Sequence, residues 1–340
     1  MIKANQLALK DIAVIGAGMA GLACATELQK AGLQVTVFEK SRGVSGRLST
    51  RLGLDNNQAW QCDHGAQYFT ARDATFRAEV LRWQQAGVAE IWQPRLQETD
   101  GLAFWEKEKT VERFVGVPRN NAPAQFLSAS VTLNTNMTII EIQKTSAGWQ
   151  LNSKEQGWLD SNFDAVVLAI PAPQAVPLLQ GLSTPLTLLA SSVKMRGCWA
   201  VMLRFNKPLI LKFDGLFVNK LPLSWVARDS SKPGRSDLSG LETWVLHADA
   251  VWSEAHIEDS PERVAEYLID AFLALGGRVP DAYTVHRWRY ADCENVASLG
   301  SAWDKQAQIG LCGDWLNGGK LQGAWLSGYQ LAQKLSTINL

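Results

Sequence analysis

The chain lacks several features that would assign it to a class at once. Its 33 Lys and Arg residues are balanced by 33 Asp and Glu residues, so no net charge favours a nucleic acid or an anionic membrane as a partner. The five cysteines include no C-x-x-C pair, which argues against a metal site and against a disulfide framework. No segment has the roughly 20 apolar residues that a membrane-spanning helix needs.

The start of the given sequence does not predict a signal peptide. The first ten residues lack the basic region, the apolar core and the cleavage site of such a peptide, so the cytoplasm is the expected location. With 340 residues, 46% of them hydrophobic, the chain is long enough for about two domains. Its 14 tryptophans are unusual, and large aromatic surfaces suit a planar ligand, although for any one tryptophan we expect core packing.

The most informative motif that is present is I-A-V-I-G-A-G-M-A-G, at residues 12–21. Gly16 allows a tight turn after a strand, Gly18 lets a pyrophosphate approach the backbone, and Gly21 lets the following helix pack closely on the strand. The helix start adds free N–H groups and a partial positive charge. Glu39 ends the next apolar strand, where a carboxylate can accept hydrogen bonds from a ribose. The sequence therefore predicts a dinucleotide site.

Two further motifs extend this prediction. The first, at residues 41–47, is S-R-G-V-S-G-R, which follows Glu39 and Lys40. Its Arg42 and Arg47 can bring permanent positive charge to a pyrophosphate. L-C-G-D-W, at residues 311–315, ends a strand, and its Asp314 can accept hydrogen bonds from ribityl or ribose hydroxyls. A helix that begins at Leu321 and Gln322 would stabilise the negative charge of a reduced flavin. Glycine and aspartate form many ordinary turns, so only the combination of the motifs favours a flavin dinucleotide.

The pattern of strands and helices predicts an α/β protein whose second domain is α+β. Apolar segments near the N-terminus, at residues 164–170 and at 308–314 belong to a Rossmann-like sheet, whereas alternating segments between 193 and 248 predict an antiparallel sheet. Both predicted domains are discontinuous. The bounds are 1–75, 131–175 and 300–340 for the FAD-binding domain, and 76–130 and 176–299 for the mainly antiparallel substrate domain. Residues 229–240, rich in Ser, Pro, Gly and charge, are expected to form an exposed loop.

Several blocks, in order along nearly the whole chain, carry a resemblance to a known family. They are F-E-K-S-R-G-V-S-G-R (38–47), D-H-G-A-Q-Y-F-T-A-R (63–72), A-I-P-A-P-Q-A (169–175), W-V-L-H-A (244–248), H-R-W-R-Y-A (286–291), C-G-D-W (312–315) and G-A-W-L-S-G (323–328). With them the chain resembles the FAD-dependent oxidoreductases of the p-hydroxybenzoate hydroxylase and amine oxidase superfamily, and within it the bacterial renalases. The block at 63–72 is the specific part of this resemblance.

The resemblance implies FAD bound without a covalent link, and no metal. The residues that it implies for FAD binding are Gly16, Ala17, Gly18, Met19, Gly21, Glu39, Lys40, Arg42, Gly46, Arg47, His64, Gly65, Ala66, Gln67, Ile139, Gly313, Asp314, Leu321, Gln322 and Ala324.

The resemblance also implies residues for the substrate cavity. These are Tyr68, His247 and Trp288, with Trp199 and Trp244 as further walls. His64 departs from the pattern, because related sequences often carry an apolar residue there, and its role is left open. His64 and His247 can equally be structural imidazoles.

The reaction implied by the renalase resemblance is the oxidation of 2- or 6-dihydroNAD(P) to NAD(P)+. A hydride passes to flavin N5, and O2 reoxidises the flavin to give H2O2. The partners are then a small dihydronicotinamide dinucleotide and O2, and the sequence does not indicate the oligomeric state. Loss of a hydride creates an aromatic pyridinium, so a strong general base is not required.

Two alternatives remain open from the sequence. A flavin amine oxidase acting on a small amine would use an aromatic pair and a lysine, and Lys194 is placed just before a strand that looks buried. Such chemistry also requires the amine to be deprotonated, and Lys194 at a strand edge is more typical of a solvent-exposed residue. The other alternative is a non-catalytic FAD-binding or redox-sensing protein.

Overall fold

A computed structural model describes residues 9–55, 57–107, 111–235 and 240–338. It divides the chain into two compact units, which we describe separately. Unit 1 comprises Met1–Gly46, Ala124–Lys194 and Cys293–Leu340, and unit 2 comprises Arg47–Pro123 and Met195–Asp292. Predictions that involve residues 1–8, 56, 108–110, 236–239 and 339–340 lie outside the described residues. The expectation about a signal peptide is one of them, because it concerns the first ten residues.

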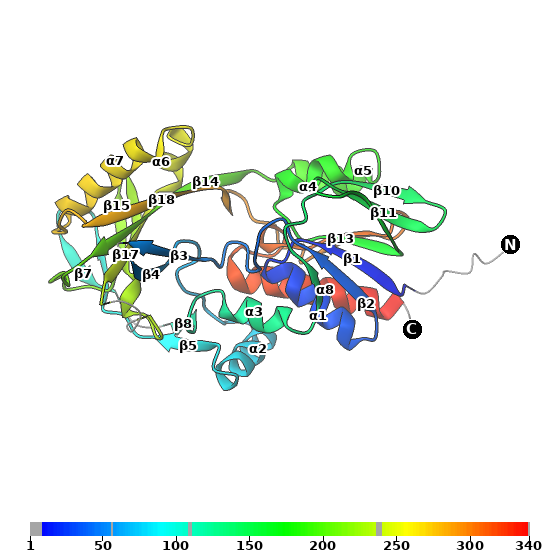
Figure 1. The fold of residues 1–340 in the computed structure, drawn as a ribbon, viewed down its shortest axis with the longest axis horizontal. Helices are drawn as coiled ribbons and strands as arrows, with labels where there is room; N and C mark the ends of the chain where they lie inside the picture. The colour runs from blue at the N-terminus through cyan, green and yellow to red at the C-terminus, as the bar shows by residue number, and fades with distance from the viewer. Residues whose placement is uncertain (1–8, 56, 108–110, 236–239, 339–340) are drawn as a thin grey trace. The chain divides into compact units, whose positions relative to one another are not determined.

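Unit 1 is built on a six-stranded sheet with the order β19-β20-β13-β1-β2-β9 (Figure 1). All neighbouring strands are parallel except β19, which is antiparallel to β20. The central strand β13 has all four residues buried, as its continuous apolar sequence predicts. The strands are β1 (Asp11–Ile15), β2 (Gln34–Phe38), β9 (Thr132–Asn134), β13 (Ala165–Leu168), β19 (Ala302–Asp304) and β20 (Ile309–Leu311).

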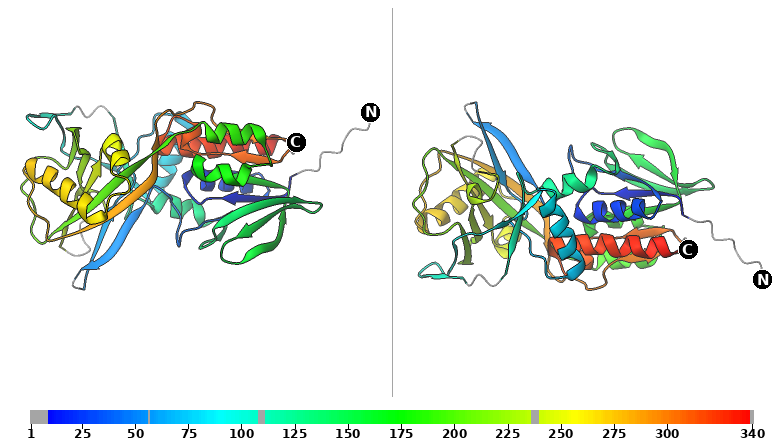
Figure 2. Two further views of the ribbon diagram at one scale, coloured as in Figure 1. Left: turned by 90° about the horizontal axis from the view of Figure 1, so that it is seen from above. Right: turned by 90° about the horizontal axis from the view of Figure 1, so that it is seen from below.

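Two helices of unit 1, α1 (Met19–Lys30) and α8 (Lys320–Ile338), lie side by side (Figure 2). Gly328 makes this close approach feasible, because a Cβ there would lie 2.0 Å from the carbonyl oxygen of Ala20. The rest of the unit is a three-stranded antiparallel sheet and short helices. These are β10 (Ile139–Thr145), β11 (Gly148–Ser153), β12 (Gly157–Phe163), α4 (Ala172–Leu179), α5 (Thr184–Ser191) and the 3-10 turn η2 (Asp314–Leu316), while α3 (Ala122–Ser128) crosses the boundary between the units.

Unit 2 contains a seven-stranded sheet with the order β18-β14-β17-β16-β15-β6-β7. Its strands are β6 (Leu96–Thr99), β7 (Phe104–Glu106), β14 (Met195–Phe205), β15 (Gly215–Lys220), β16 (Leu223–Arg228), β17 (Glu242–Ala248) and β18 (Ala282–Cys293). One hairpin, one further two-stranded antiparallel sheet and four helical segments complete the unit. They are β3 (Thr50–Asp55) with β4 (Gln58–Asp63), β5 (Ala89–Trp92) with β8 (Arg113–Gly116), α2 (Ala74–Gln85), η1 (Asp229–Ser231), α6 (Ala250–Ala255) and α7 (Pro261–Ala274).

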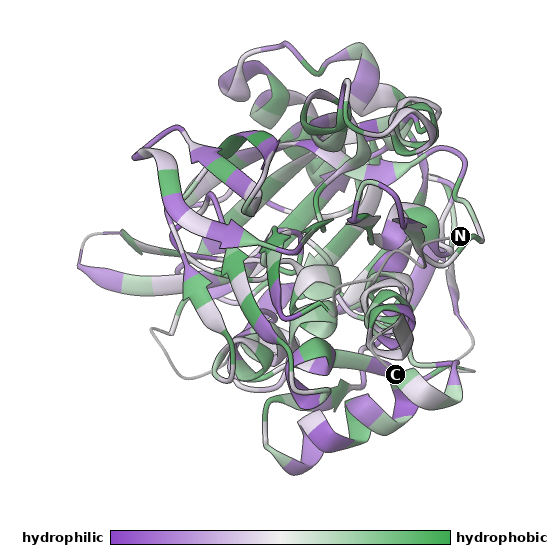
Figure 3. Ribbon diagram, turned by 90° about the vertical axis from the view of Figure 1, so that its right-hand side faces the viewer, coloured by the Kyte–Doolittle hydropathy of each residue, from purple (hydrophilic) through white to green (hydrophobic). Residues whose placement is uncertain are grey.

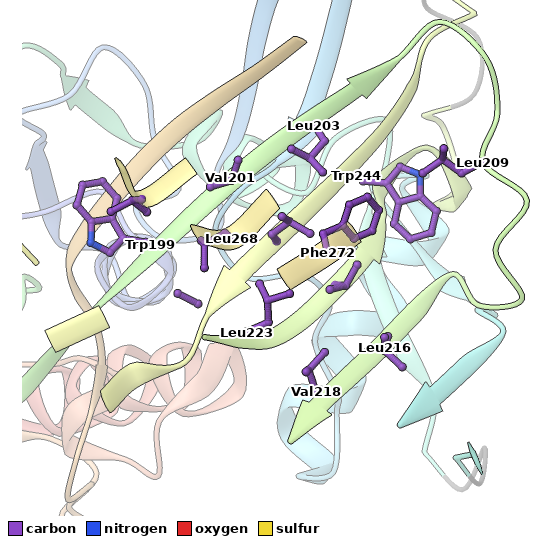
Figure 4. Close-up of a cluster of buried hydrophobic side chains, with 14 of the residues drawn as sticks. Trp199, Val201, Leu203, Leu209, Leu216, Val218, Leu223, Trp244, Leu268 and Phe272 are labelled. Atoms are coloured by element: carbon purple, nitrogen blue, oxygen red, sulfur yellow. The ribbon is translucent and has the colours of Figure 1, made fainter. Parts of the chain in front are cut away.

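The core of unit 2 lies between this sheet and α7 (Figure 4). Trp199 and Trp244, which were expected as walls of a substrate cavity, are 1% and 0% exposed within this core. Their ring N–H groups donate to the carbonyl of His256 and to Glu242. Burial with an internal hydrogen-bond partner leaves neither ring free to wall a cavity, so they are core residues.

Apolar residues are concentrated along the strands, while the helices are mixed in character (Figure 3). In α7 the buried residues Val264, Ala265, Leu268 and Phe272 fall on one face, which is typical of an amphipathic helix that covers a sheet. No helix in the described ranges is long and apolar enough to cross a membrane.

The unit boundaries differ from the predicted domain boundaries. Residues 47–75 belong to unit 2, because the hairpin of β3 and β4 packs Trp60 and Cys62 into a cluster with Met202, Trp225 and Val245. Unit 1 also extends to Lys194 instead of residue 175, since α4 and α5 contact β10 and β19. The first segment of unit 1 therefore ends at Gly46, and not at residue 75 as predicted.

Candidate functional site

The carboxyl ends of four parallel strands in unit 1 form one edge of the sheet. Gly16 directly follows β1, Glu39 follows β2, Ala169 follows β13 and Cys312 follows β20. Backbone hydrogen bonds join these turns: Gly16 N donates to Phe38 O at 2.8 Å, and Ala169 N donates to Ile15 O at 2.8 Å. In open α/β sheets this edge is where ligands bind.

The glycine turn at this edge is closed toward the protein and open on its other side. Gly16 has a φ of +105°, and a Cβ on it would lie 2.6 Å from Ala169 O; a Cβ on Gly21 would lie 2.0 Å from Gly16 O. Gly18 has no neighbouring atom within 4 Å of its Cβ position, and it begins α1 without a side-chain cap. Open space at a helix N-terminus, with no side chain to fill it, fits a pyrophosphate.

Glu39 presents a fixed carboxylate beside this turn. The residue is 7% exposed, and its two carboxylate oxygens accept hydrogen bonds from Ala17 N and Ser41 N, each at 2.8 Å. Each oxygen has a second lone pair for a ribose hydroxyl. Ile139 follows shortly after Met137, whose N–H donates to the carbonyl of Glu39 at 2.9 Å.

A second tight turn follows β20 and leads into α8. Asp314 is 8% exposed, and Gly318 and Gly319 have φ values of +74° and +70°. Gly323 lies in the first turn of α8, where a Cβ would be 2.0 Å from Asn317 O. Unit 1 thus offers a second helix N-terminus, which carries Leu321, Gln322 and Ala324. Three other residues of this unit were predicted to bind the cofactor. A Cβ on Gly46 would lie 3.4 Å from the Cα of Gly18. Lys40 and Arg42 are exposed.

The remaining predicted residues belong to unit 2. Gly65 packs so closely that a Cβ would lie 2.0 Å from Arg47 O, and Ala66 N donates to the same carbonyl at 2.9 Å. The Arg47 guanidinium donates to Ala291 O at 3.1 Å. Gln67 closes the turn, with its amide donating to Asp63 O at 2.6 Å. The backbone of residues 63–67 is therefore held in a single conformation.

The carbonyl oxygen of His64 joins two of the predicted substrate residues. It accepts hydrogen bonds from His247 Nε2 at 3.2 Å and from Trp288 Nε1 at 2.9 Å. The His64 ring stacks on Trp288 with 5.2 Å between centroids and 22° between planes. Tyr68 lies apart from these rings, against Trp225 at 5.8 Å.

The imidazoles of this group are neutral. Burial lowers the pKa of His64 to about 3 and the pKa of His247 to about 4. Because a carbonyl oxygen can only accept, the hydrogen bond to His64 fixes the proton of neutral His247 on Nε2. The imidazole rings of His64 and His247 therefore carry no charge at physiological pH.

A network of buried charges contacts Asp63 and Gln67, the first and last residues of the segment 63–67. Lys232 Nζ donates to Asp229 at 2.7 Å, to Asp63 at 3.0 Å and to the Gln67 side-chain oxygen at 3.2 Å. Arg235 donates to Asp63 at 2.7 Å. The four charged side chains are fully buried. Two cations and two carboxylates balance one another in this network.

The pKa values follow from this balance. Burial alone would lower the pKa of Lys232, but the charges of Asp229 and Asp63 raise it above its ordinary value. Burial would raise the pKa of Asp63, but Lys232 and Arg235 hold it far below its usual range. Burial and the charge of Asp63 raise the pKa of Asp229.

The prediction of an exposed loop at residues 229–240 is therefore wrong for its described charged residues, while Gly234 and Gly240 are exposed. Asp229, Lys232 and Arg235 are 0%, 2% and 4% exposed. The burial of these residues was not predicted, because a stretch rich in Ser, Pro, Gly and charge is typical of a surface loop. The sequence does place Asp229 and Lys232 three residues apart, a spacing at which an acid and a base can pair. This spacing indicates a buried network only when Asp63 is known to lie beside the pair.

Lys194, the lysine considered for amine oxidation, has an exposed side chain. Its Nζ lies 2.9 Å from the Glu294 carboxylate, and 69% of the side chain is accessible. It is a surface ion pair, as its position at a strand edge suggested. Among the described residues no group of three or more His, Cys, Asp or Glu is arranged to hold a metal ion.

Family models match two segments of the chain. Residues 14–80 match the NAD(P)-binding Rossmann-like domain, which includes the glycine turn and Glu39. Residues 87–336 match the flavin containing amine oxidoreductase family. The second match covers well over half of the chain.

Individual relatives agree with these matches. The bifunctional protein MnmC of tRNA 5-methylaminomethyl-2-thiouridine biosynthesis from Magnetococcus marinus is 29% identical over 217 residues, which are 50% of this chain and 31% of that protein. The chain thus spans about a third of the length of the curated relatives it first matches. Among solved structures, cyclohexylamine oxidase from Brevibacterium oxydans has a TM-score of 0.74 at 12% identity, covering 97% of this chain and 99% of that one. An oxidoreductase from Methanosarcina mazei has a TM-score of 0.70 at 12% identity, with 95% and 100% covered. These structures share the fold, so the predicted fold class is confirmed.

Replacing Lys232 by Met tests the buried network. We expect a loss of about 3–5 kcal/mol in the free energy of unfolding, because Asp229 would be buried without its cation. Urea denaturation of the flavin-loaded protein measures this loss. Lys194→Met is the matched control, since breaking an exposed pair changes stability by about 0–1 kcal/mol. Asp229→Asn combined with Lys232→Met should recover part of the loss. Equal stability of Lys232→Met and the wild type would contradict the network's structural role.

Proposed function

The chain belongs to the flavin containing amine oxidoreductase family, and we propose that within it the protein oxidises isomeric dihydronicotinamides, the 2- and 6-dihydro forms of NAD(P). As a member of this family the protein is an FAD-dependent oxidoreductase, and the prediction of FAD is confirmed. When bound, FAD supplies the hydride acceptor at N5 and passes the electrons to O2, which yields H2O2. The product would be NAD(P)+.

We assign the cofactor roles from the geometry of unit 1. Gly16, Gly18 and Gly21, with the N–H groups of Ala17 and Met19, would hold the pyrophosphate, since they leave open space at the start of α1. Glu39 would accept the adenosine ribose hydroxyls, and the backbone of Ile139 would contact the adenine. Asp314 and the first turn of α8 would lie along the ribityl chain and the flavin. The residues present therefore fit FAD.

We assign further roles to residues of unit 2. Arg47 would contact the phosphates, and the segment from His64 to Gln67 would contact the flavin. His247 and Trp288 would contact the substrate. Tyr68 retains this proposed role with less support, because its ring packs against Trp225.

One observation supports dihydronicotinamide oxidation above the alternatives: the polar groups around His64 are not suited to accept a proton. His64 and His247 have strongly lowered pKa values, and Asp63 is held by Lys232 and Arg235. A dihydronicotinamide requires no base, because loss of its hydride produces an aromatic pyridinium. Such a substrate needs an aromatic ring to stack on, and Trp288, which is partly exposed and packs its ring on neutral His64, offers one.

Amine oxidation is the second candidate, and the family and its solved structures favour it. The family is named for amine oxidation, and cyclohexylamine oxidase shares the fold. Within the described residues, Lys194 is exposed and Lys232 donates to three acceptors, so neither lysine supports this candidate. A non-catalytic FAD-binding or redox-sensing role would be excluded by rapid reduction of the flavin by a substrate. No disulfide joins the five cysteines, all of which lie in the described residues, and this supports a reducing compartment such as the cytoplasm.

Anaerobic reduction by a panel of substrates tests the proposed activity. We expect 2- or 6-dihydroNAD(P) to bleach the flavin absorbance within seconds, whereas ordinary β-NAD(P)H and simple amines such as cyclohexylamine should do so at least about 100-fold more slowly. Stopped-flow absorbance at the flavin band measures the rates. Fast bleaching by an amine would favour the second candidate instead. No bleaching by any member of the panel would contradict both catalytic candidates.

Two substitutions separate cofactor residues from substrate residues. Glu39→Gln should weaken FAD binding by about tenfold or more, because an amide cannot accept from both Ala17 N and Ser41 N. His247→Ala should slow flavin reduction by about tenfold or more while FAD affinity changes little. Fluorescence titration of the apoprotein with FAD and stopped-flow reduction of the loaded fraction measure the two effects. Equal effects of both variants on both quantities would contradict this division.

A further inference from the structure

Arg51 is a cation without an acidic partner in the described part of the chain. It lies on β3, on the same face of the hairpin as Cys62. Its Nη2 is 3.2 Å from His286 Nδ1, while its Nε is buried and has no hydrogen-bond partner within the described ranges. Asp63, the last residue of the paired strand β4, already binds Lys232 and Arg235. The positive charge of Arg51 is therefore not neutralised by the unit that holds it.

His64 has a second unsatisfied group in the same place. The residue is 4% exposed, yet its Nδ1 has no hydrogen-bond partner among the residues that the structure describes. The His64 ring meets the His286 ring edge to face, with 4.6 Å between centroids. Its carbonyl is engaged by His247 and Trp288, so the fixed backbone prevents the ring from finding a partner elsewhere.

Buried polar atoms without partners are costly, at about 1–3 kcal/mol each. Arg51 Nε and His64 Nδ1 belong to neighbouring side chains that both contact His286. His286 adds no negative charge, because burial and Arg51 lower its pKa to about 4 and it is neutral at physiological pH. The cluster is thus one guanidinium surrounded by neutral rings, with two donor or acceptor atoms left unused.

We propose that Arg51, His64 and His286 form a subsite for an oxyanion, a phosphate or carboxylate group carried by the substrate. A guanidinium is the side chain best matched to such a group, because its planar N–H donors pair with two oxygens at once. His64 Nδ1 can add a third donor. The proposal rests on the proposed function, since it extends the substrate site around His64, and it fits a dihydronicotinamide that bears a phosphate better than a simple amine.

Titration of the oxidised, FAD-loaded enzyme with inorganic phosphate, pyrophosphate and benzoate at constant ionic strength tests the subsite. Isothermal calorimetry should detect binding to the wild type. Arg51→Gln should weaken it about tenfold or more, and Arg51→Lys, which keeps the charge but not the planar donors, should lie between the two. His64→Phe keeps the ring stacked on Trp288 and should weaken binding by a smaller factor. Tighter binding of pyrophosphate assigns a phosphate, and tighter binding of benzoate assigns a carboxylate.

Arg289→Gln is the matched control, because Arg289 is an exposed arginine of β18, the strand that carries His286, and it is already paired with Glu258. It should bind all three anions as the wild type does. Equal affinities of the wild type and Arg51→Gln would overturn the proposal, as would the absence of binding to the wild type. Loss of FAD from Arg51→Gln without any anion binding to the wild type would assign Arg51 to the cofactor and also overturn it.

A comparison of substrates separates this proposal from the proposed function. Dihydronicotinamide mononucleotide carries a phosphate, and the corresponding riboside does not. The wild type should show a lower KM for the mononucleotide, and Arg51→Gln should abolish the difference while kcat changes little. If neither compound reduces the flavin, the proposed function fails, but the anion titration still decides whether the subsite exists.

Discussion

The segment of unit 2 from Asp63 to Gln67 depends on one buried ion pair, between Lys232 and Asp63. Lys232 also holds Asp229 and Gln67, so a single ammonium joins the segment after β4 to the segment after β16. That contact fixes the backbone at residues 63–67 and, with it, the carbonyl of His64. The cost of burying four charges is offset only because each has an opposite charge within hydrogen-bond distance.

The turns at the sheet edge of unit 1 depend on backbone packing and not on charge pairs. Parallel strands bring the turns after β1, β2 and β20 to one edge, and the backbone packs so closely that Gly16, Gly21 and Gly323 admit no side chain. Glu39 is held there by two backbone N–H groups instead of a cation. Its carboxylate therefore remains available to hydroxyl donors. The contrast is physically sensible, because a dinucleotide is bound largely through backbone N–H groups and helix N-termini, whereas an uncharged ring needs a rigid apolar surface.

The sequence predicted the features that depend on local geometry and missed those that depend on distant partners. The turn from Gly16 to Gly21 and the continuous apolar strand β13 follow from spacing alone, and both are present. Lys232 pairs with a carboxylate 169 residues away, and Arg51 meets His286 across 235 residues, so no local pattern reports either contact. Trp199 left two roles open for a related reason: an aromatic ring in a strand suits a cavity or a core, and the packing of Trp199 places it in the core.

The pH dependence of flavin reduction tests the central claim most directly, namely that the reaction is hydride loss from a substrate that needs no base. Burial holds the pKa values of His64 and His247 at about 3 and about 4, so both imidazoles remain neutral above these values. With a dihydronicotinamide as substrate, the limiting rate constant in anaerobic stopped flow should vary by less than about twofold between about pH 5 and pH 9. A rate that rises about tenfold per pH unit across this range would show that a proton must first be lost, and would contradict the account.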